Sequence, residues 1–455
     1  LKYSPANYAG ADFVPGSTMK ETLTGKINIK DAVVSVIGLG YVGLPLAVEM
    51  AKAGYRVIGV DVNAKVVEGV NRGESHVGDV STEALKPLIE SGRVKAHVDY
   101  EAIEDADCVS ICVPTPLRKT KDPDISCITD AVDRILPHIG PGKLVVLEST
   151  TYPGTTEELI AERIKAERGL EVGEEIFVAF SPERVDPGNE KWNTKNTPKV
   201  LGGVTPNCTE VAKALYSAVV DNVHTVKSAR EAETVKLLEN TFRAVNIGLV
   251  NEFALMCDRL EIDIWSVIEA AATKPFGFMS FYPGPGIGGH CIPLDPLYLS
   301  WKAREYGVNT RFIELAGEIN TFMPEYVVGK TIAVLNESGK SLKGSKVLVI
   351  GVAYKENIDD SRESPGIRIL ELLMERGAET SYYDPYIPEV SGLRQTDISM
   401  ESVDFDDEIL KKQDAVIIAT AHSDIDYKKI VDTCPLIIDT RNALSDFNND
   451  KIVIA

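Results

Sequence analysis

The sequence predicts an α/β protein in which two doubly wound domains, each with a parallel sheet, are joined by a central α-helical domain. Short apolar strands alternate with helical segments over residues 26–212 and again from residue 323 onward. Between these blocks one helical pattern covers residues 228–260 without a proline. Strands that alternate with helices form parallel sheets, because each helix returns the chain to the same edge. We therefore expect an N-terminal arm at 1–25, a first α/β domain at 26–212, a helical domain at 213–322 and a second α/β domain at 323–455.

Composition excludes several classes of partner. The chain has 455 residues and a net charge of -20, so general binding to nucleic acid or to an anionic membrane is not expected. No apolar run is long enough to cross a bilayer, and the N-terminal residues lack the pattern of a signal peptide. The 7 cysteines are odd in number and no second Cys or His pair stands at ligand spacing, so neither a disulfide framework nor a metal site is expected. These features predict a cytoplasmic protein.

A strand, a glycine-rich turn, a helix, a second strand and an acid follow one another near the start of the first block. The strands cover residues 33–37 and 56–60, the helix covers 45–53, and the second strand ends at Asp61. Glycines in such a turn let backbone amides approach a pyrophosphate at a helix N-terminus. A carboxylate at Asp61 accepts hydrogen bonds from ribose hydroxyls and repels a 2′-phosphate, which favours NAD over NADP. The sequence thus predicts a Rossmann-like NAD-binding domain, with a turn formed by Gly38, Leu39, Gly40, Tyr41, Val42 and Gly43.

Three more predicted strands of this block, at residues 106–113, 144–147 and 176–180, are followed by polar residues. Ligands bind at the carboxyl ends of the strands in such sheets. Thr150 and Glu183 follow the second and the third of these strands, so both are candidate site residues. Ordinary loop capping is the alternative for each of them.

The predicted helix at residues 228–260 carries apolar residues at steps of three and four. It is longer than a single small domain needs, so we expect it to bridge domains and to form a homodimer contact. Lys236 and Asn240 stand four residues apart on one face and could meet one small group. The alternative is a solvated lysine and an asparagine inside the helix.

A loop rich in glycine and proline, residues 284–296, follows an aromatic segment at residues 273–282. The aromatic side chains could stack on a base or cover the core. We expect the loop to present the thiol of Cys291 as a nucleophile in a cleft between the α/β blocks. Asp295 followed by Pro296 predicts a helix that begins just after them and whose N-terminus favours the Cys291 thiolate. A catalytic role for Asp295 is the alternative, and it is compatible with capping.

The last block repeats the strand and turn pattern with a strand at residues 346–350, but only Gly351 of the glycine fingerprint is present. The next helix is expected to begin with Ser364 as its N-cap. Lys355 and Arg362 lie in the loop between them, where they could clamp a diphosphate or be two surface cations. We expect a nucleotide-type fold that binds a different phosphate ligand.

From about Lys20 onward the chain resembles the UDP-glucose/GDP-mannose dehydrogenase family. The segments at residues 181–188 and 274–278 look like the branch that acts on UDP-N-acetylhexosamines, in particular UDP-N-acetylglucosamine 6-dehydrogenases. In the UDP-glucose branch a Phe-Leu pair follows the Pro-Glu and a lysine stands in place of Leu294, and both are absent here. The family motifs are Gly38-Leu39-Gly40-Tyr41-Val42-Gly43-Leu44-Pro45, Lys236-x3-Asn240, Gly288-Gly289-His290-Cys291-Ile292-Pro293-x-Asp295, and Lys355 with Ser361-Arg362-Glu363-Ser364.

The resemblance implies oxidation of the C6 alcohol of a UDP-N-acetylhexosamine to the carboxylate with two NAD, for surface polysaccharide precursors. The aldehyde must gain an oxygen before a second hydride can leave, and Cys291 would provide this through a hemithioacetal and a thioester. Lys236 and Asn240 would stabilise oxyanions at C6. Asp295, and Glu183 with Thr150 through a water, would act as bases. The implied cofactor contacts are residues 38–43, Asp61, Val113, Pro114, Thr115, Thr150 and Arg362, and the implied substrate contacts are Glu183, Arg184, Lys236, Asn240, Lys274, Tyr282, Gly286 and Lys355.

Two other functions fit parts of the sequence. A two-electron β-hydroxyacid dehydrogenase also combines a Rossmann domain, a long helix and a Lys-x3-Asn pair, but it needs neither Cys291 nor the last block. A nucleotide sensor or scaffold that kept the fold would bind NAD without turnover. One sequence does not determine the C2 and C4 stereochemistry of the sugar, so UDP-N-acetylmannosamine, UDP-N-acetylgalactosamine and UDP-glucose are alternative substrates.

Overall fold

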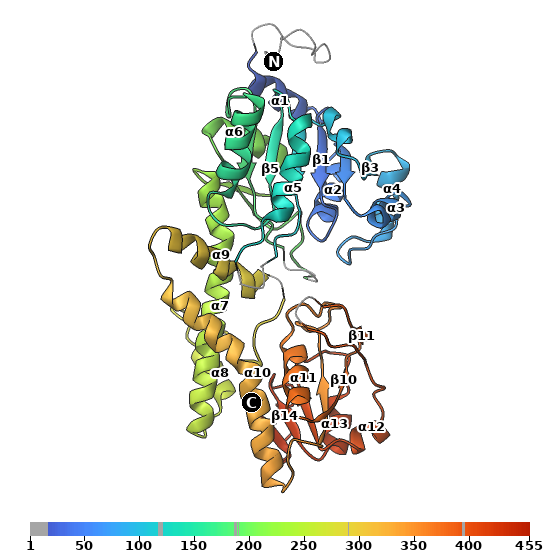
Figure 1. Ribbon diagram of the computed structural model, residues 1–455, viewed down its shortest axis with the longest axis vertical. Helices are drawn as coiled ribbons and strands as arrows, with labels where there is room; N and C mark the ends of the chain where they lie inside the picture. Colours follow the sequence, from blue (N-terminus) through green and yellow to red (C-terminus); the bar gives the residue numbers. More distant parts are fainter. Residues whose placement is uncertain (1–16, 117–121, 186–188, 190, 290, 394–395) are drawn as a thin grey trace. The chain divides into compact units, whose positions relative to one another are not determined.

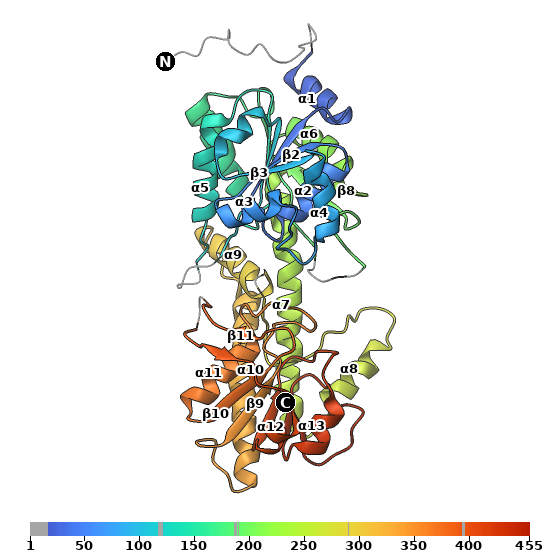
Figure 2. The ribbon, with the colours of Figure 1, turned by 90° about the vertical axis from the view of Figure 1, so that its right-hand side faces the viewer.

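The computed structural model describes residues 17–116, 122–185, 189, 191–289, 291–393 and 396–455, and of Cys291 only the backbone. Most of the predicted N-terminal arm, residues 1–16, lies outside the described part. The chain divides into two compact units, Leu1–Leu238 and Glu239–Ala455, called unit 1 and unit 2 below. Each unit is described by itself (Figures 1 and 2). Among the described residues no helix combines the length and the apolar character that a membrane span requires.

Unit 1 is built on one sheet with the strand order β3-β2-β1-β4-β5-β6-β7-β8. Its neighbouring strands are parallel except β6 and β7, which are antiparallel. The predicted doubly wound parallel sheet is confirmed, and β7 joins it antiparallel to β6, with no helix among the described residues between these two strands. Strands β1, β2, β4 and β5 confirm the first four predicted strands, at residues 33–37, 56–60, 106–113 and 144–147, within two residues at each end. The strands are β1 Val33–Ile37, β2 Arg56–Val60, β3 Val94–His97, β4 Cys108–Ile111, β5 Leu144–Leu147, β6 Phe177–Phe180, β7 Lys199–Gly203 and β8 Val223–Thr225.

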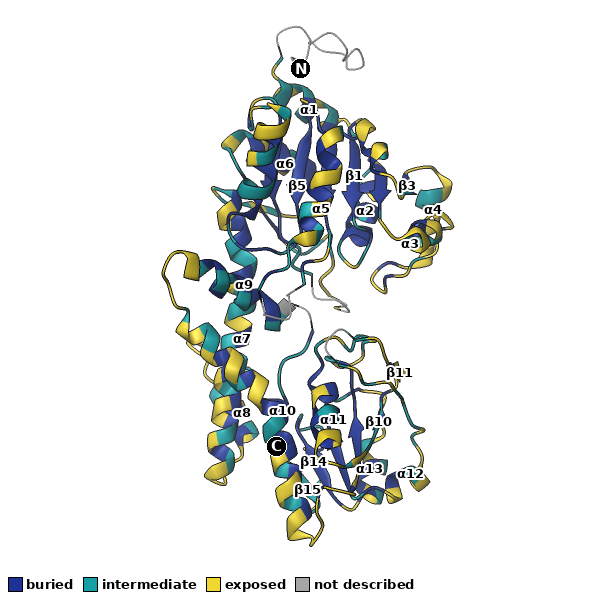
Figure 3. Ribbon diagram, in the orientation of Figure 1, coloured by how far each residue is buried: buried dark blue, intermediate teal, exposed yellow. Residues whose placement is uncertain are grey.

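Helices cover both faces of this sheet, and the strands between them are buried (Figure 3). Side chains of α1, α2 and α6 pack on one face, and those of α5 and the start of α7 pack on the other. Alternate residues of each strand enter opposite cores, as with Val36 and Ile37, because successive side chains of a strand point to opposite faces. The helical segments are α1 Met19–Asn28, α2 Gly43–Lys52, α3 Ala64–Asn71, α4 Thr82–Glu90, η2 Tyr100–Asp105, α5 Ser126–Ile135, η3 Leu136–His138, η4 Thr156–Ala161, η5 Ile164–Arg168 and α6 Pro206–Ser217.

The long helix predicted after the first block is confirmed as α7, Ala229–Arg259. Its first residues belong to unit 1 and the rest to unit 2. Unit 2 continues with α8 Ile264–Ala272, α9 Cys291–Glu305 and α10 Arg311–Glu337. Buried Ala254 of α7 packs with Ile268 of α8 in a small apolar cluster.

The start of α9 differs from the expectation that the helix begins after Pro296. The helix begins at Cys291, so Asp295 is not its N-cap and Pro296 lies inside it. Pro293 falls in the first turn, where a missing N–H leaves no helical bond unmade. Pro296 lacks one helical hydrogen bond, and the burial of Leu294 and Asp295 accompanies this defect. The Asp-Pro pair resembled a cap because the same residue types suit the first turn of any helix.

The second sheet, in unit 2, has the strand order β10-β9-β13-β14-β15 and all its neighbouring strands are parallel. The predicted N-cap is confirmed, since Ser364 Oγ accepts a 3.1 Å hydrogen bond from the N–H of Gly366 at the start of α11. Helices α10 and α11 cover one face, and α12 and α13 cover the other. The elements are β9 Lys346–Ile350, α11 Pro365–Glu375, β10 Glu379–Tyr383, β11 Glu389–Val390, β12 Met400–Glu401, α12 Asp407–Lys411, β13 Ala415–Ile418, α13 Tyr427–Thr433, β14 Ile437–Asp439 and β15 Ile452–Ile454.

Candidate active site

The glycine-rich turn after β1 has the backbone that a pyrophosphate site requires. Gly38 has φ +88°, and a Cβ there would lie 2.7 Å from the carbonyl oxygen of Cys112. A Cβ on Gly43 would lie 1.8 Å from the carbonyl oxygen of Gly38, so only glycine lets α2 start this close to β1. At Gly40 nothing lies within 4 Å of the Cβ position, which leaves open space beside the backbone. Val42 makes no side-chain capping bond, and the N–H of Leu44 donates a 3.0 Å hydrogen bond to the carbonyl of Gly40.

Asp61, at the end of β2, is tied to this turn. Its Oδ2 accepts a hydrogen bond from the backbone N–H of Leu39 at 2.8 Å, and its Oδ1 accepts one from that of Asn63 at 2.9 Å. The carboxylate is partly exposed, and its other lone pairs can accept ribose hydroxyls. Tyr41 of the turn is 54% exposed. The predicted turn and its acid therefore lie together, and these residues fit a dinucleotide.

The three predicted cofactor residues after β4 lie at the same edge of the sheet. Thr115 is buried, Val113 is partly buried and Pro114 is exposed. Ser149, at the end of the neighbouring strand β5, donates a 2.7 Å hydrogen bond to the carbonyl of Val113. This bond joins the ends of the two central strands beside the glycine turn.

Two candidate catalytic residues meet in unit 1. Lys236 Nζ on α7 donates a 2.6 Å hydrogen bond to Thr150 Oγ1 after β5. One helical turn earlier, buried Glu233 accepts hydrogen bonds from the N–H of Gly154 at 2.6 Å and from the N–H and hydroxyl of Thr156 at 2.9 and 2.7 Å. Glu233 thus fixes α7 to the segment that carries Thr150. Sequence analysis missed this residue, although an acid three positions before a candidate lysine faces nearly the same side of the helix.

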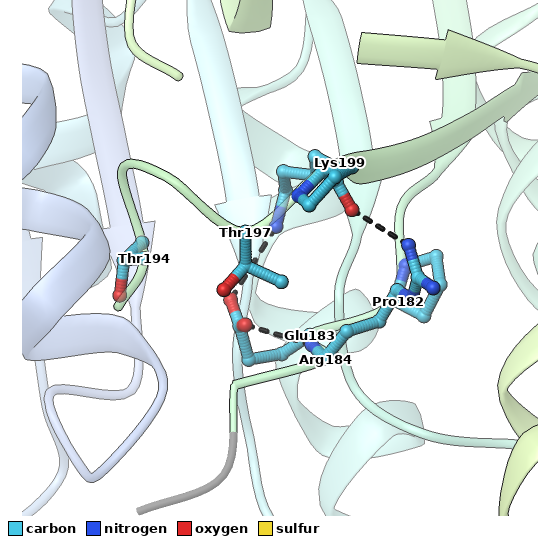
Figure 4. A pocket seen from close by; sticks show the side chains of 7 residues that line it. Pro182, Glu183, Arg184, Thr194, Thr197 and Lys199 are labelled. Atoms are coloured by element: carbon cyan, nitrogen blue, oxygen red, sulfur yellow. Dashed lines mark hydrogen bonds and ion pairs between the residues drawn. The ribbon is translucent and has the colours of Figure 1, made fainter. Parts of the chain in front are cut away.

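Glu183, after β6, lines a small pocket at the edge of unit 1 (Figure 4). Its Oε1 accepts hydrogen bonds from the backbone N–H groups of Arg184 at 2.7 Å and Val185 at 2.9 Å, and its Oε2 lies 3.5 Å from Lys199 Nζ. The guanidinium of Arg184 donates a 2.6 Å hydrogen bond to the carbonyl of Pro198. The pocket is lined by Pro182, Glu183, Arg184, Thr194, Thr197, Pro198 and Lys199.

The Glu183 carboxyl is held in its ionised form. Burial raises its pKa, but the ammonium of Lys199 and the N–H groups of Val185 and Arg184 lower it, and the resulting pKa lies below the usual value. An ionised carboxylate at neutral pH can take up a proton, as a general base does. Lys199 was not predicted as a site residue; a lysine at the start of an otherwise apolar strand is the signal that could have identified it.

In unit 2, Asn240 of α7 and Asp295 of α9 meet. Asn240 Nδ2 donates a 2.5 Å hydrogen bond to Asp295 Oδ2, and Asp295 is 3% exposed. Position 295 lies four residues after the first residue of α9, Cys291, so the two positions share one face of the helix. The side chain of Cys291, predicted as the nucleophile, lies outside the described part of the structure, and so does His290. The helix N-terminus that was expected near the thiol is at Cys291 itself.

The glycine-rich segment before α9 is anchored by buried asparagines. Asn251 of α7 accepts a 3.0 Å hydrogen bond from the N–H of Gly284 and donates one of 2.9 Å to Asn320 of α10. Gly286 has φ +129°, and a Cβ there would lie 3.1 Å from the carbonyl oxygen of Asn320. At Gly288 a Cβ would lie 2.6 Å from that of Tyr354. The segment therefore packs on the loop after β9, which carries the predicted diphosphate residues.

Those predicted residues differ in their surroundings. Arg362 is exposed and its Nη2 donates a 2.6 Å hydrogen bond to Asp360. The carbonyl of Arg362 accepts a 3.0 Å hydrogen bond from the N–H of Gly289, which joins its loop to the glycine-rich segment. Lys355, on the same loop, is partly buried.

The aromatic segment is more exposed than the sequence suggested. Lys274 is exposed, and its Nζ lies 5.2 Å from the ring centroid of exposed Phe276. Tyr282 stacks on Trp265 of α8 with the ring centroids 5.6 Å apart. Of the two alternatives for this segment, covering the core does not hold for Phe276, which is 71% exposed.

Arg441, just after β14, is a candidate that sequence analysis missed. Its Nε donates a 2.9 Å hydrogen bond to the carbonyl of Ala419, and a Cβ on Gly284 would lie 2.5 Å from its Nη1. Burial lowers the pKa of this guanidinium to about 10, although Glu356 and Asp439 raise it. A desolvated cation beside the glycine-rich segment favours an anionic ligand. Its place at a strand end in the last block could have identified it.

The sequence matches three domain descriptions of one family. Residues 32–220 match the NAD binding domain of the UDP-glucose/GDP-mannose dehydrogenase family. Residues 230–322 match its central domain, and residues 348–446 match its UDP binding domain. The matches thus extend over both units.

Known proteins are similar along most of the chain. A Methanococcus maripaludis (strain C7) protein named UDP-N-acetyl-D-mannosamine dehydrogenase is 34% identical over 433 residues, which cover 92% of this chain and 94% of that one. A Pseudomonas aeruginosa protein named UDP-N-acetyl-D-glucosamine 6-dehydrogenase is 33% identical over 397 residues, 87% of this chain and 92% of that one. The solved structure of the UDP-D-ManNAc dehydrogenase from Pyrococcus horikoshii superimposes with a TM-score of 0.84 at 32% identity, covering 93% and 98% of the two chains.

Proposed function

Because this chain belongs to the UDP-glucose/GDP-mannose dehydrogenase family, we propose that it oxidises the C6 hydroxymethyl of a UDP-N-acetylhexosamine to the carboxylate with two NAD. The observation that carries the proposal is the Asn240–Asp295 hydrogen bond of 2.5 Å, one helical turn from Cys291. This pair puts an amide donor and a carboxylate beside the position of the only residue in the motif that can form a thioester.

The second oxidation needs a covalent step. Until a nucleophile adds to the aldehyde carbon, that carbon cannot transfer its hydride and reach the oxidation level of a carboxylate. In the first oxidation C6 loses a hydride and the hydroxyl loses its proton. The Cys291 sulfur would then add to the aldehyde carbon and form a hemithioacetal, which loses its hydroxyl proton and the second C6 hydride to leave a thioester. Water cleaves the C–S bond, which releases the carboxylate and the thiol. When bound, NAD supplies the hydride acceptor for both oxidations.

The chain's own residues would stabilise charge and move protons. The Lys236 ammonium and the Asn240 amide would donate to the oxygen on C6 as it becomes negative, and such donors are typically worth roughly 3 kcal/mol each. Glu183, whose pKa lies below its usual value, would accept the proton of a water that Thr150 helps to hold. Asp295 would accept the proton of the Cys291 thiol, and the N-terminus of α9 would favour the thiolate.

For the substrate, the segments at residues 181–188 and 274–278 favour UDP-N-acetylglucosamine. UDP-N-acetylmannosamine is the second candidate, because the Methanococcus maripaludis relative is named for that sugar. Arg441 and Lys355, both in unit 2, would bind the diphosphate of the UDP-sugar. The other residues that would contact the sugar nucleotide are Tyr282, Gly286, Arg184 and Lys274.

A panel of UDP-sugars tests this proposal directly. NADH formation is followed with UDP-N-acetylglucosamine, UDP-N-acetylmannosamine, UDP-N-acetylgalactosamine and UDP-glucose, and the uronate is quantified. We expect two NADH for each N-acetylated sugar consumed. A ratio of one would indicate a two-electron dehydrogenase, and NAD binding without turnover would indicate a sensor.

We further propose a cytoplasmic homodimer that makes precursors of a surface polysaccharide and that associates through α7. Phe242, Phe253 and Met256 of this helix are each about half exposed, at 46%, 45% and 46%. Apolar side chains in a row on one helix face favour burial against a partner. Sedimentation of the wild type and of Phe253→Glu tests this, and a wild-type monomer would contradict it.

A further inference from the structure

A chain of buried polar groups in unit 1 ends at Glu183. Lys199, the first residue of β7, is 5% exposed in its side chain, and its Nζ lies 2.7 Å from Oε2 of Glu148, which is fully buried. The other oxygen of Glu148 accepts a hydrogen bond from the hydroxyl of Tyr216 on α6. That hydroxyl lies 3.3 Å from Ser110 Oγ on β4. Lys199 therefore cannot move without breaking contacts that extend into the sheet.

The two oxygens of Glu183 have different surroundings. Oε1 accepts two backbone hydrogen bonds, from Arg184 at 2.7 Å and Val185 at 2.9 Å. Oε2 faces Lys199 Nζ at 3.5 Å, which is ion-pair distance but longer than a strong hydrogen bond (Figure 4). Rotation of the carboxylate would break both backbone bonds, so Oε2 is the oxygen that can take up a proton.

We propose that Lys199 is a positioning residue of the reaction: its ammonium keeps Glu183 ionised and lies beside Oε2, the oxygen that serves as the base. This inference rests on the proposed role of Glu183 in activating water. Lys199 acts through Glu183 and does not touch the substrate. Glu148 and Tyr216 have the supporting role of holding the ammonium at the pocket wall.

The energetics of the buried Lys199–Glu148 ion pair favour a role in function over a role in stability. A buried lysine and glutamate lose their hydration, and an apolar pair of similar size usually stabilises a core at least as well. A buried cation that serves only the fold is found at the other end of β5. There Lys143 donates to the carbonyls of Glu104 at 2.7 Å and Ala106 at 2.6 Å and contacts no candidate site residue.

The electrostatic surroundings agree with this role. Burial lowers the pKa of Lys199, but Glu148 and Glu183 raise it above its usual value, so the ammonium stays charged across the neutral range. Among the described residues, the other titratable groups that face Lys199 or Glu183 are Cys112 after β4, Glu148 after β5, Arg184 beside Glu183, Tyr216 on α6 and Lys236 on α7.

The experiment replaces the buried pair without leaving a buried charge unpaired. Lys199→Met alone would strand Glu148 and risks misfolding, so the main variant is Lys199→Met with Glu148→Gln, whose amide oxygen still accepts from Tyr216. The pKa of the Glu183 carboxyl is measured by infrared titration, as the difference between spectra recorded with and without Glu183→Gln in the same background. This measurement does not require catalytic turnover. We expect this pKa to rise by up to about one unit, the lower end of the effect of a nearby opposite charge, because removal of the Glu148 carboxylate offsets part of the loss of the ammonium.

The steady-state readout uses whichever UDP-sugar the wild type oxidises. The acid limb of the kcat profile should move by the same amount in the double variant, while KM stays within about twofold because no substrate contact is lost. Lys199→Arg, which keeps the charge, should restore the wild-type limb. If the wild type oxidises no UDP-sugar, the proposed function fails, and the infrared titration still decides the role of Lys199.

The matched control is Lys143→Met, which removes a buried lysine from the same domain far from Glu183. It should lower the thermal midpoint and leave both the infrared titration and the pH profile unchanged. An unshifted Glu183 pKa in the folded double variant would overturn the inference. An equal shift in Lys143→Met would do the same, because it would show a general effect of destabilisation.

Discussion

Lys236 Nζ and Thr150 Oγ1 are joined by a 2.6 Å hydrogen bond between α7 and the segment that follows β5. The bond places a cation from the long helix at the carboxyl end of a central strand, the edge where ligands bind in sheets of this kind. Glu233, one turn earlier on α7, fixes the same two segments through three further hydrogen bonds. The orientation of Lys236 thus depends on both contacts.

The Thr150 hydroxyl should be needed to orient Lys236. Thr150→Val keeps the shape of the side chain but removes the acceptor, and a hydrogen bond to a charged group contributes roughly 1.5 to 3 kcal/mol. We expect kcat to fall roughly 10- to 100-fold. Thr150→Ser is the matched control and should retain most activity. Wild-type kcat in Thr150→Val would remove Thr150 from the catalytic set.

Cys291 should be required for the acid but not for NAD binding. Its position at the start of α9 is in unit 2, while the glycine turn that fits NAD is in unit 1. Cys291→Ala should therefore form no uronate and still titrate with NAD as the wild type does. Chromatography measures the amount of uronate formed, and calorimetry measures the binding of NAD. Uronate at the wild-type rate would show that another nucleophile is used.

Alanine substitutions at two glycines of the turn should have different effects, one on stability and the other on NAD binding. A Cβ on Gly43 would lie 1.8 Å from the carbonyl oxygen of Gly38, so Gly43→Ala should displace α2 and lower stability. The Cβ position of Gly40 meets nothing within 4 Å, so Gly40→Ala should fold normally but place a methyl where the pyrophosphate approaches the backbone. We expect at least a roughly tenfold weaker Kd for NAD in Gly40→Ala at unchanged thermal midpoint.

If Gly40→Ala bound NAD as tightly as the wild type, the pyrophosphate would have to lie elsewhere. The comparison with Gly43→Ala separates loss of binding from loss of folding. Circular dichroism of the two variants supplies that control.

Glu233 should make stability depend on pH. Burial raises its pKa to about 7, against the opposing effect of its hydrogen bonds to Gly154 and Thr156. Because the pKa of a glutamate in an unfolded chain is about 4.3, the contribution of this group to stability is complete below that pH and is lost as pH rises through 7. The change amounts to roughly 4 kcal/mol, at about 1.4 kcal/mol per unit.

Urea unfolding of the wild type and Glu233→Gln between pH 4 and 8 measures this term. The glutamine does not titrate, so the difference in unfolding free energy between the two proteins should vary across that window. Glu157→Gln removes a negative charge that raises the pKa of Glu233, so in this variant the pH-dependent loss of stability should be smaller. A pH-independent difference would mean that Glu233 has an ordinary pKa in the fold.

Sequence patterns were sufficient where a local rule sets the structure. The turn from Gly38 to Gly43 and the carboxylate of Asp61 were predicted because a close backbone approach permits only glycine and a strand end orients the acid. Ser364 was predicted as an N-cap for the same kind of reason, since its partner Gly366 is two residues away. The long helix α7 followed from its apolar period alone.

Sequence patterns failed where distant segments compete or combine. The Asp295-Pro296 pair has the local signature of a helix start, but burial of the preceding turn extends α9 back to Cys291. The antiparallel pairing of β7 with β6 has no signature in either strand.

The sequence by itself determined the fold class, the order of the elements, the NAD turn and the motif residues, because each depends on residues close together along the chain. Only the tertiary structure decided that Glu233 holds the Thr150 segment, that Lys199 faces Glu183 and that Arg441 approaches Gly284. These contacts join residues that are 16 or more positions apart along the chain. The charge of a buried group depends on which partner the folded chain brings to it, and no local pattern encodes that partner.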